Sequence, residues 1–293
     1  RSSAASDVYK RQLLFNQTYN DSIKLINNIT ERNDNMSYPD FYKLKLLEKD
    51  GKRIHTIPEG RKVPFEAIGT IDPKDVQKVL DFSLDMAYGE GHHRDHRRGG
   101  EHKRTPNEIF ISDIQGKLAE YAVYYCLKDY GLEMNEPNLD VYGENVWDSV
   151  DIDCNGKHIS IKSTKDFGQL LLLEKKDWDE SGRYIPNIKI PNKVAEYDYH
   201  ILVRISPSCE DLLRARKLFY GKEIPEDVVE MLKKQKWTYS MPRFITREEL
   251  ITLIEKNFVL KAGEYFNRTK MDATNYYVKA YDMHKLFEIK DKL

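Results

Sequence analysis

The sequence predicts an α/β fold, in which a central mixed β-sheet is flanked by helices and follows a mainly helical N-terminal region. Three observations support this prediction. A two-residue turn signal between alternating apolar residues predicts a β-hairpin over residues 149–163. Apolar runs at residues 169–173 and 199–205 predict buried strands. Helical patterns stand on both sides of the hairpin, and such intermixing is typical of an α/β or α+β core.

The composition sets the limits within which this fold must lie. The 293 residues are 40% hydrophobic and 32% charged, which suits one large domain or a domain with an appendage and excludes general disorder. The net charge of −1 excludes a generally polycationic nucleic-acid coat, but it allows a locally basic site. Three scattered cysteines exclude a disulfide framework and favour a reducing, cytoplasmic location. The longest clean apolar run, residues 170–173, is far shorter than the roughly 20 residues of a membrane span, so we expect a soluble protein.

The N-terminal part is the least regular. Residues 2–12 look like the translation of a sequencing-library adaptor, with an ordinary disordered tail as the alternative, so residues 1–12 are left out of the fold prediction. Residues 13–71 are Asn-rich and weakly periodic, with three prolines as breakers, which predicts short helices and loops. Asp72-Pro73 opens a better helix that stops at Gly89. Residues 13–88 are therefore expected to form the mainly helical region.

Residues 89–106 contain no apolar side chain and predict a flexible basic loop. Its cations could bind phosphates, although a solvated linker is the alternative. Its histidines allow a second alternative, a metal-dependent phosphohydrolase that would use His92, His93, Asp95 and His96. The predicted nucleic-acid-binding residues are Arg94, Arg97, Arg98, Lys103 and Arg104.

Residues 107–293 show the densest structural signals. A helix is predicted over residues 113–129, with Ser112 as its N-cap and Gly131 just beyond its end. The pattern Thr246-x-x-Glu249 is a capping box that opens another helix. Further helices are predicted over residues 211–219, 226–235 and 247–257, and residues 276–280 are strand-like.

The hairpin brings reactive side chains together. Asn155-Gly156 predicts a two-residue turn, which places Asp151 opposite Ser160. Lys162 is then the diagonal neighbour of Asp151, about 7–8 Å away and within reach of a long side chain. Alternation sends these three to one face, and it sends Val150, Ile152, Ile159 and Ile161 to a core face.

Glu120 is the second unusual acid. It lies on a helical stripe with Gly116, Ala119, Val123 and Leu127, where a purely solvated carboxylate is not expected. The small residues beside it indicate that backbone or substrate approaches closely. The alternative is an edge salt bridge, with Lys117 or Tyr124 as the neighbour.

The order of Glu120, then Asp151, then Ser160-Ile161-Lys162 resembles the PD-(D/E)XK nuclease superfamily over about residues 108–205. The resemblance implies a restriction-endonuclease-like core and a Mg²⁺-dependent endonuclease of restriction type that cleaves double-stranded DNA, with Mn²⁺ as an alternative metal. It implies catalytic roles for Glu120, Asp151, Ser160 and Lys162. It also implies metal binding by Glu120, Asp151 and the Ile161 carbonyl.

One position departs from the family. Ser160 stands where Glu, Asp or Gln is usual, and a hydroxyl is a poor Mg²⁺ ligand, so Glu120 or, second, Glu174 would have to supply the missing acid. Asp153 could replace Asp151, but it lies opposite His158 in this register. If no acid reaches the site, the domain would bind DNA without cutting it. A two-fold DNA site would suit a homodimer, although the sequence reveals no interface.

Overall fold

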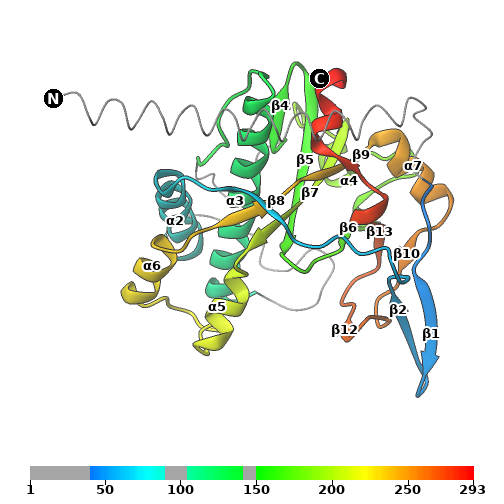
Figure 1. Cartoon of the computed structure of the whole chain (residues 1–293), viewed down its shortest axis with the longest axis horizontal. Coiled ribbons are helices and arrows are strands. Elements are labelled where there is room, and N and C mark those ends of the chain that lie inside the picture. Colours follow the sequence, from blue (N-terminus) through cyan, green and yellow to red (C-terminus); the bar gives the residue numbers. More distant parts are fainter. Residues whose placement is uncertain (1–39, 90–103, 141–149) are drawn as a thin grey trace, which may run out of the picture. The chain divides into compact units, whose positions relative to one another are not determined.

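A mixed β-sheet built around strands β5 and β7 organises the computed structural model, which describes residues 40–89, 104–140 and 150–293 (Figure 1). The described elements belong to the unit 41–293. Strand β5 pairs in parallel with β7, while β4 and β9 are antiparallel neighbours on either side of this pair. This confirms the predicted α/β class with a mixed sheet. The seven strands are β3 (Ala67–Thr70), β4 (Ile152–Cys154), β5 (Lys157–Lys165), β7 (Tyr199–Ser206), β8 (Thr238–Ser240), β9 (Arg243–Thr246) and β14 (His284–Lys285).

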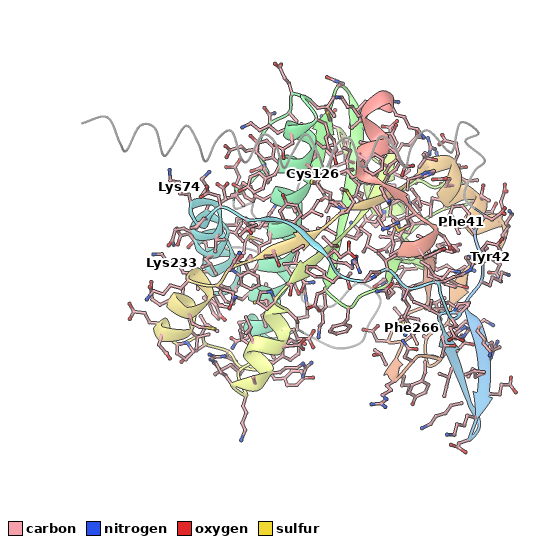
Figure 2. All side chains as sticks on the ribbon, in the orientation of Figure 1. Phe41, Tyr42, Lys74, Cys126, Lys233 and Phe266 are labelled. Carbon is pink, nitrogen blue, oxygen red and sulfur yellow. The ribbon has the colours of Figure 1, made fainter. Side chains whose placement is uncertain are left out.

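Helices cover one face of this sheet and form the first core. Ile159 of β5 and Ile201 of β7 are fully buried there against Leu118 and Ala122. Cys126, labelled in Figure 2, belongs to the same core, and all three cysteines are buried as free thiols. The helices on this face are α2 (Pro73–Tyr88), α3 (Pro106–Asp129), α5 (Cys209–Ala215) and α6 (Glu226–Lys233). The 3₁₀ segment η3 (Leu286–Lys292) packs against the same core.

The opposite face of the sheet carries a second core. Leu202 and Ile245 alternate to this side and pack with Leu171 and Val278 of a separate three-stranded sheet. Because β7 is covered on both faces, its run of apolar residues is nearly continuous, as is typical of strands buried on both sides. The elements on this side are β6 (Leu170–Glu174), β10 (Val259–Leu260), β13 (Asn275–Lys279), α4 (Ile185–Ile188), α7 (Arg247–Glu255) and the 3₁₀ turns η1 (Lys175–Asp177) and η2 (Ala280–Asp282).

A small four-stranded sheet replaces the short helices predicted before residue 72. It contains β1 (Lys45–Lys49), β2 (Lys52–Thr56), β11 (Tyr265–Phe266) and β12 (Thr269–Lys270) in that order. The predicted helices are absent from residues 45–56, because Asp50 and Gly51 both adopt positive φ, 48° and 69°, and form a two-residue hairpin turn. Residues 67–70 are also a strand, which pairs with β8, whereas residues 57–66 are a loop. The helix predicted after Asp72 is confirmed as α2, which Asp72 caps.

Helix α3 begins earlier than predicted. Thr105 caps it, Pro106 occupies its first turn, and Glu108 completes a capping box, so residues 106–112 are helical and not part of a loop or a cap. The predicted end is confirmed, since Gly131 follows with φ of 81°. The capping box of Thr246 and Glu249 is also confirmed at α7.

Candidate active site

The β4–β5 hairpin has the predicted register. Ile152 pairs with Ile159, Asp153 with His158 and Cys154 with Lys157, around a turn in which Asn155 and Gly156 have φ of 53° and 75°. Backbone pairing stops at Ile152, and Val150 packs against the second core instead of the predicted first core. Alternation fails there because Val150 lies outside the strand.

Asp151 is fastened to the hairpin through its side chain. Its Oδ2 accepts a hydrogen bond from the backbone N–H of Ile161, on the second strand. The carboxylate therefore lies beside Ser160 even though the backbone ladder has ended. About a third of its side chain is exposed (32%), which leaves it accessible to a ligand.

Lys162 completes the cluster. Its Nζ donates to Ser160 Oγ at 2.8 Å and to the Ile161 carbonyl at 3.1 Å, and it lies 3.9 Å from Asp151 Oδ2. Ser160 itself is buried. Asp151, Ser160, Ile161 and Lys162 therefore meet at one point, as the turn geometry predicts.

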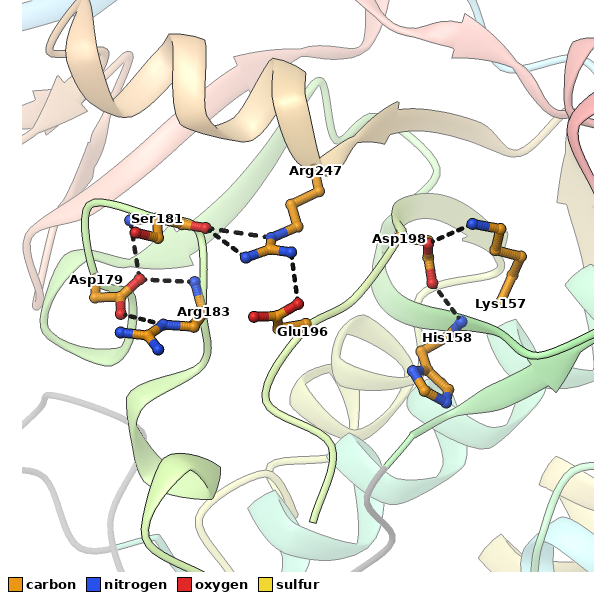
Figure 3. A network of polar contacts seen from close by, with 8 residues as sticks. All are labelled: Lys157, His158, Asp179, Ser181, Arg183, Glu196, Asp198 and Arg247. Atoms are coloured by element: carbon orange, nitrogen blue, oxygen red, sulfur yellow. Dashed lines mark hydrogen bonds and ion pairs between the residues drawn. The ribbon is translucent and has the colours of Figure 1, made fainter. Parts of the chain in front are cut away.

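A polar network fixes the strand next to this cluster (Figure 3). Asp198, just before β7, accepts hydrogen bonds from Lys157 Nζ and from the N–H of His158, both at 2.9 Å. Burial opposes the charged form of Asp198, but these two hydrogen bonds outweigh it and lower the pKa of its carboxyl. The Asp198 carbonyl also accepts from the N–H of Arg247, whose guanidinium holds Glu196 at 2.7 Å. The start of β7 is thereby tied to both β5 and α7.

This alignment places His200 beside the cluster. His200 pairs with Ser160 across the parallel strands, is fully buried, and lies edge-on to Trp178 with ring centroids 4.9 Å apart. Burial, helped by the nearby charge of Lys162, lowers its pKa to about 3, so the imidazole is neutral at physiological pH. Neither ring nitrogen has a hydrogen-bond partner in the described part of the chain. Sequence reasoning missed this residue, and its signal was a histidine inside an otherwise apolar strand.

Glu120 lies on a different face. Helix α3 covers the side of β5 that carries Ile159 and Ile161, whereas Ser160 and Lys162 alternate to the other side. Glu120 is buried and forms an ion pair with Lys117 at 2.8 Å, the alternative that the sequence left open. No atom of the described residues lies within 4 Å of the place that a Cβ of Gly116 would take, so no described backbone approaches the helix closely at that glycine.

The other candidate acids are also accounted for. Glu174 ends β6 in the separate sheet and pairs with Lys176 at 3.5 Å. Asp153 lies near the turn and 3.3 Å from His158, as its register predicts. Within the described ranges, no three His, Cys, Asp or Glu side chains are close enough together to hold a metal ion. Asp151, Glu120 and Glu174 therefore do not form a three-acid site.

The predicted basic loop falls almost entirely outside the described residues. Arg94, Arg97, Arg98 and Lys103, and the alternative set of His92, His93, Asp95 and His96, lie there, as do residues 1–12. Arg104 is described and is half-buried just before α3. Burial raises the pKa of Asp113, on the next turns of that helix, to about 7, although the charges of Arg104 and Lys117 oppose this shift.

The cluster fits a magnesium ion in part. Asp151 offers a carboxylate and Ile161 a carbonyl, and Mg²⁺ accepts one or two protein oxygens while keeping several waters. A groove of about 870 Å³ lies elsewhere, at the turn end of the hairpin, lined by residues that include Lys128, Glu133 and Asn155. Asp151, Ser160 and Lys162 do not line that groove.

Comparisons with known proteins found no match among family models, curated protein sequences or solved structures. No helix in the described ranges has an apolar stretch long enough to cross a membrane.

Proposed function

We propose that this chain is a Mg²⁺-dependent DNA endonuclease of restriction type, built on a PD-(D/E)XK-like core. The observation that carries the proposal is the convergence of Asp151, Ser160 and Lys162 at the open end of the β4–β5 hairpin. An acid and an ammonium held on a rigid strand are the groups that phosphodiester hydrolysis needs. The parallel pairing of β5 and β7 inside a mixed sheet supports the expected core.

The metal would be held by Asp151 and the Ile161 carbonyl, with water completing its coordination. When bound, Mg²⁺ would polarise the scissile phosphate and lower the pKa of a coordinated water. The N–H of Ile161 orients the Asp151 carboxylate for this task. Ile161 therefore both holds the acid and offers a ligand of its own.

Lys162 would act on the water and the phosphate. The Ser160 hydroxyl and the Ile161 carbonyl both accept from its ammonium, which fixes that group 3.9 Å from Asp151. From this place Lys162 would orient the attacking water and neutralise the charge that develops on the phosphoryl oxygens. Ser160 thus serves as a positioning residue for Lys162. About a third of the side chains of Lys162 and Asp151 is exposed (31% and 32%), which leaves both groups accessible to a polymeric substrate such as DNA.

A second candidate is a DNA-binding module on the same fold that does not cut. Two observations favour it: Ser160 replaces the usual acid, and Glu120 is held by Lys117 on the α3 side of the sheet. A single carboxylate would then remain to bind the metal, which weakens metal affinity. Cleavage activity decides between the two candidates.

The test is cleavage of supercoiled plasmid and of diverse linear duplexes in Mg²⁺ and, separately, in Mn²⁺. We expect Lys162→Ala to lose at least about 100-fold in rate because it removes the stabilising ammonium. Glu120→Gln and Glu174→Gln show which acid, if either, assists Asp151. Lys165→Ala is the matched control, since Lys165 lies on the same strand but pairs with Glu210 and Asp211.

Each other outcome changes the proposal. Cleavage that survives in Lys162→Ala overturns the site assignment. Cleavage lost in His96→Ala but not in Lys162→Ala favours the alternative phosphohydrolase. A wild-type protein that binds every duplex but cuts none in either metal favours the binding module.

A further inference from the structure

One face of the small sheet gathers lysines. Along β1, Lys45 and Lys49 alternate to the same side, and Lys49 pairs directly with Lys52 of β2. The pairing of Ile54 with Tyr265, and of Tyr265 with Lys270, continues this side across β11 and β12. We call this side the lysine face; it consists of Lys45, Lys49, Lys52 and Lys270 around Leu47, Ile54 and Tyr265.

The lysine face has no acidic partner among the described residues. In the part of the chain that the structure describes, none of its four lysines forms an ion pair, and all four are exposed. Lys52 Nζ lies over the Tyr265 ring, 5.3 Å from its centroid, which confirms that these two side chains share a side of the sheet.

The opposite face is neutralised internally. Glu48 stands opposite Arg53 in the strand register, and Arg53 forms an ion pair with Glu264 at 2.8 Å. His55 also contacts Glu264, at 2.7 Å. The sheet therefore segregates its charges: Arg53 and Glu264 pair on one face, while the four lysines of the other face have no acidic partner among the described residues.

Folding alone does not account for this arrangement. Like charges directly opposite each other, such as Lys49 and Lys52, destabilise a hairpin. Strand β1 exposes all five of its side chains, so packing does not compensate. Figure 1 shows the β1–β2 hairpin extending away from the main sheet, where a large partner can reach it.

We propose that the lysine face binds the phosphate backbone of double-stranded DNA. The inference rests on the proposed function for the identity of this polyanion. Lys45 and Lys49 are four residues apart, roughly 13 Å along an extended strand, which corresponds to about four nucleotide steps of a DNA strand. A two-stranded ribbon of this kind also fits the width of a DNA groove. The lysine face then adds affinity without reading sequence, while the Asp151–Lys162 cluster acts on the bound strand.

The test measures DNA binding without cleavage. A fluorescent duplex is titrated with the full chain in EDTA, by anisotropy, at salt concentrations from about 50 to 200 mM. The variant carries Gln at Lys45, Lys49, Lys52 and Lys270. The matched control carries Gln at four exposed lysines on other elements, Lys74, Lys222, Lys236 and Lys256, and has the same net charge.

The logarithm of the binding constant falls linearly with the logarithm of the salt concentration, and each phosphate contact adds roughly 0.9 to the steepness of this line. We expect the line for the lysine-face variant to be less steep by about three to four. Its affinity at about 100 mM salt should fall at least 100-fold. The control should keep its slope within about one. Replacing the same four lysines by Arg should restore binding, because the charge returns.

Three results would overturn the inference. Equal losses in the variant and the control would show that total charge matters and the face does not. If the wild-type chain binds no duplex even at the lowest salt concentration, duplex DNA is not its ligand. If the lysine-face variant still binds DNA but no longer binds phosphatidylserine vesicles, the lysine face is a membrane-binding surface. The proposed function is judged separately by plasmid cleavage, so either hypothesis can fail while the other stands.

Discussion

Two hairpins in this chain have the same kind of turn but differ in how far their strands are buried. Both β1–β2 and β4–β5 reverse through two residues of positive φ that end in glycine. The β4–β5 hairpin buries Ile152, Cys154 and Ile159 almost completely, whereas β1 leaves all five side chains exposed. Turn chemistry therefore starts a hairpin, while the elements packed against the strands decide whether the hairpin belongs to the core.

The difference also divides the two proposed roles. The Asp151–Lys162 cluster lies on the hairpin that cannot open without disturbing the first core, so its geometry is fixed before any substrate arrives. The lysine face lies on a hairpin that packs little and can adjust to the surface of a duplex.

The two hairpins should differ most in their contribution to global stability. Ile159→Ala removes a fully buried side chain and should lower the free energy of unfolding by about 2–5 kcal/mol. Leu47→Ala, on the first strand of the exposed hairpin, should change it by no more than about 0.5 kcal/mol. Guanidinium denaturation of both variants measures the difference. Similar losses in the two would show that the β1–β2 hairpin is also part of the cooperative core.

His200 should make the core hairpin sensitive to acid. Its pKa is about 3 when folded and about 6.5 when unfolded, so the unfolded chain binds the extra proton. The stability that neutral His200 contributes is complete above pH 6.5 and is lost as the pH falls towards 3, by roughly 1.4 kcal/mol per unit.

Denaturation between about pH 6.5 and 5, above the range in which most carboxylates titrate, isolates this effect. The variant His200→Phe should flatten the dependence over that window. An unchanged slope would mean that other groups cause the acid sensitivity. His284 does not interfere, because Glu249 and Glu288 outweigh burial and raise its pKa to about 9, which moves its effect above pH 6.5.

The smallest effect concerns the like-charged pair of the exposed hairpin. Lys49→Glu places an acid opposite Lys52 and should stabilise β1–β2 by about 0.2–1 kcal/mol. Amide hydrogen exchange of these strands, compared with Lys49→Gln, measures the gain as local protection. The same change should weaken DNA binding more than Lys49→Gln does. A hairpin that is no better protected would show that the facing lysines carry no strain.

The sequence predicts the hairpin at Asn155-Gly156 but not the one at Asp50-Gly51, although both turns use the same chemistry. The first turn is flanked by strictly alternating apolar residues, because Ile152, Ile159 and Ile161 face the first core. The second turn lacks such flanks, because β1 buries none of its side chains. Strands β11 and β12 have two residues each, too short for any periodic signal. The start of α3 was missed because a proline and polar residues resemble a loop until the capping box of Thr105 and Glu108 is recognised.

The residues of the candidate site also fall into two groups, those that a local pattern predicts and those that long-range packing places. The approach of Lys162 to Asp151 depends on a local turn and on strand spacing, so counting residues from the turn predicts it. The place of Glu120 depends on which face α3 covers, and that of His200 on which strand pairs with β5. Both are long-range choices made by packing, and no local pattern encodes them.

The tie between Asp198 and the start of β5 has a consequence for the order of folding. A hairpin with a two-residue turn closes within microseconds, whereas the β5–β7 pair must wait for a separate sheet strand and a long crossover to be placed. Asp151 and Lys162 can therefore meet early, on a local structure. His200 comes next to them only after the longer loop closes and β7 pairs with β5. The Asp151–Lys162 pair can therefore form before the strand that packs beside it.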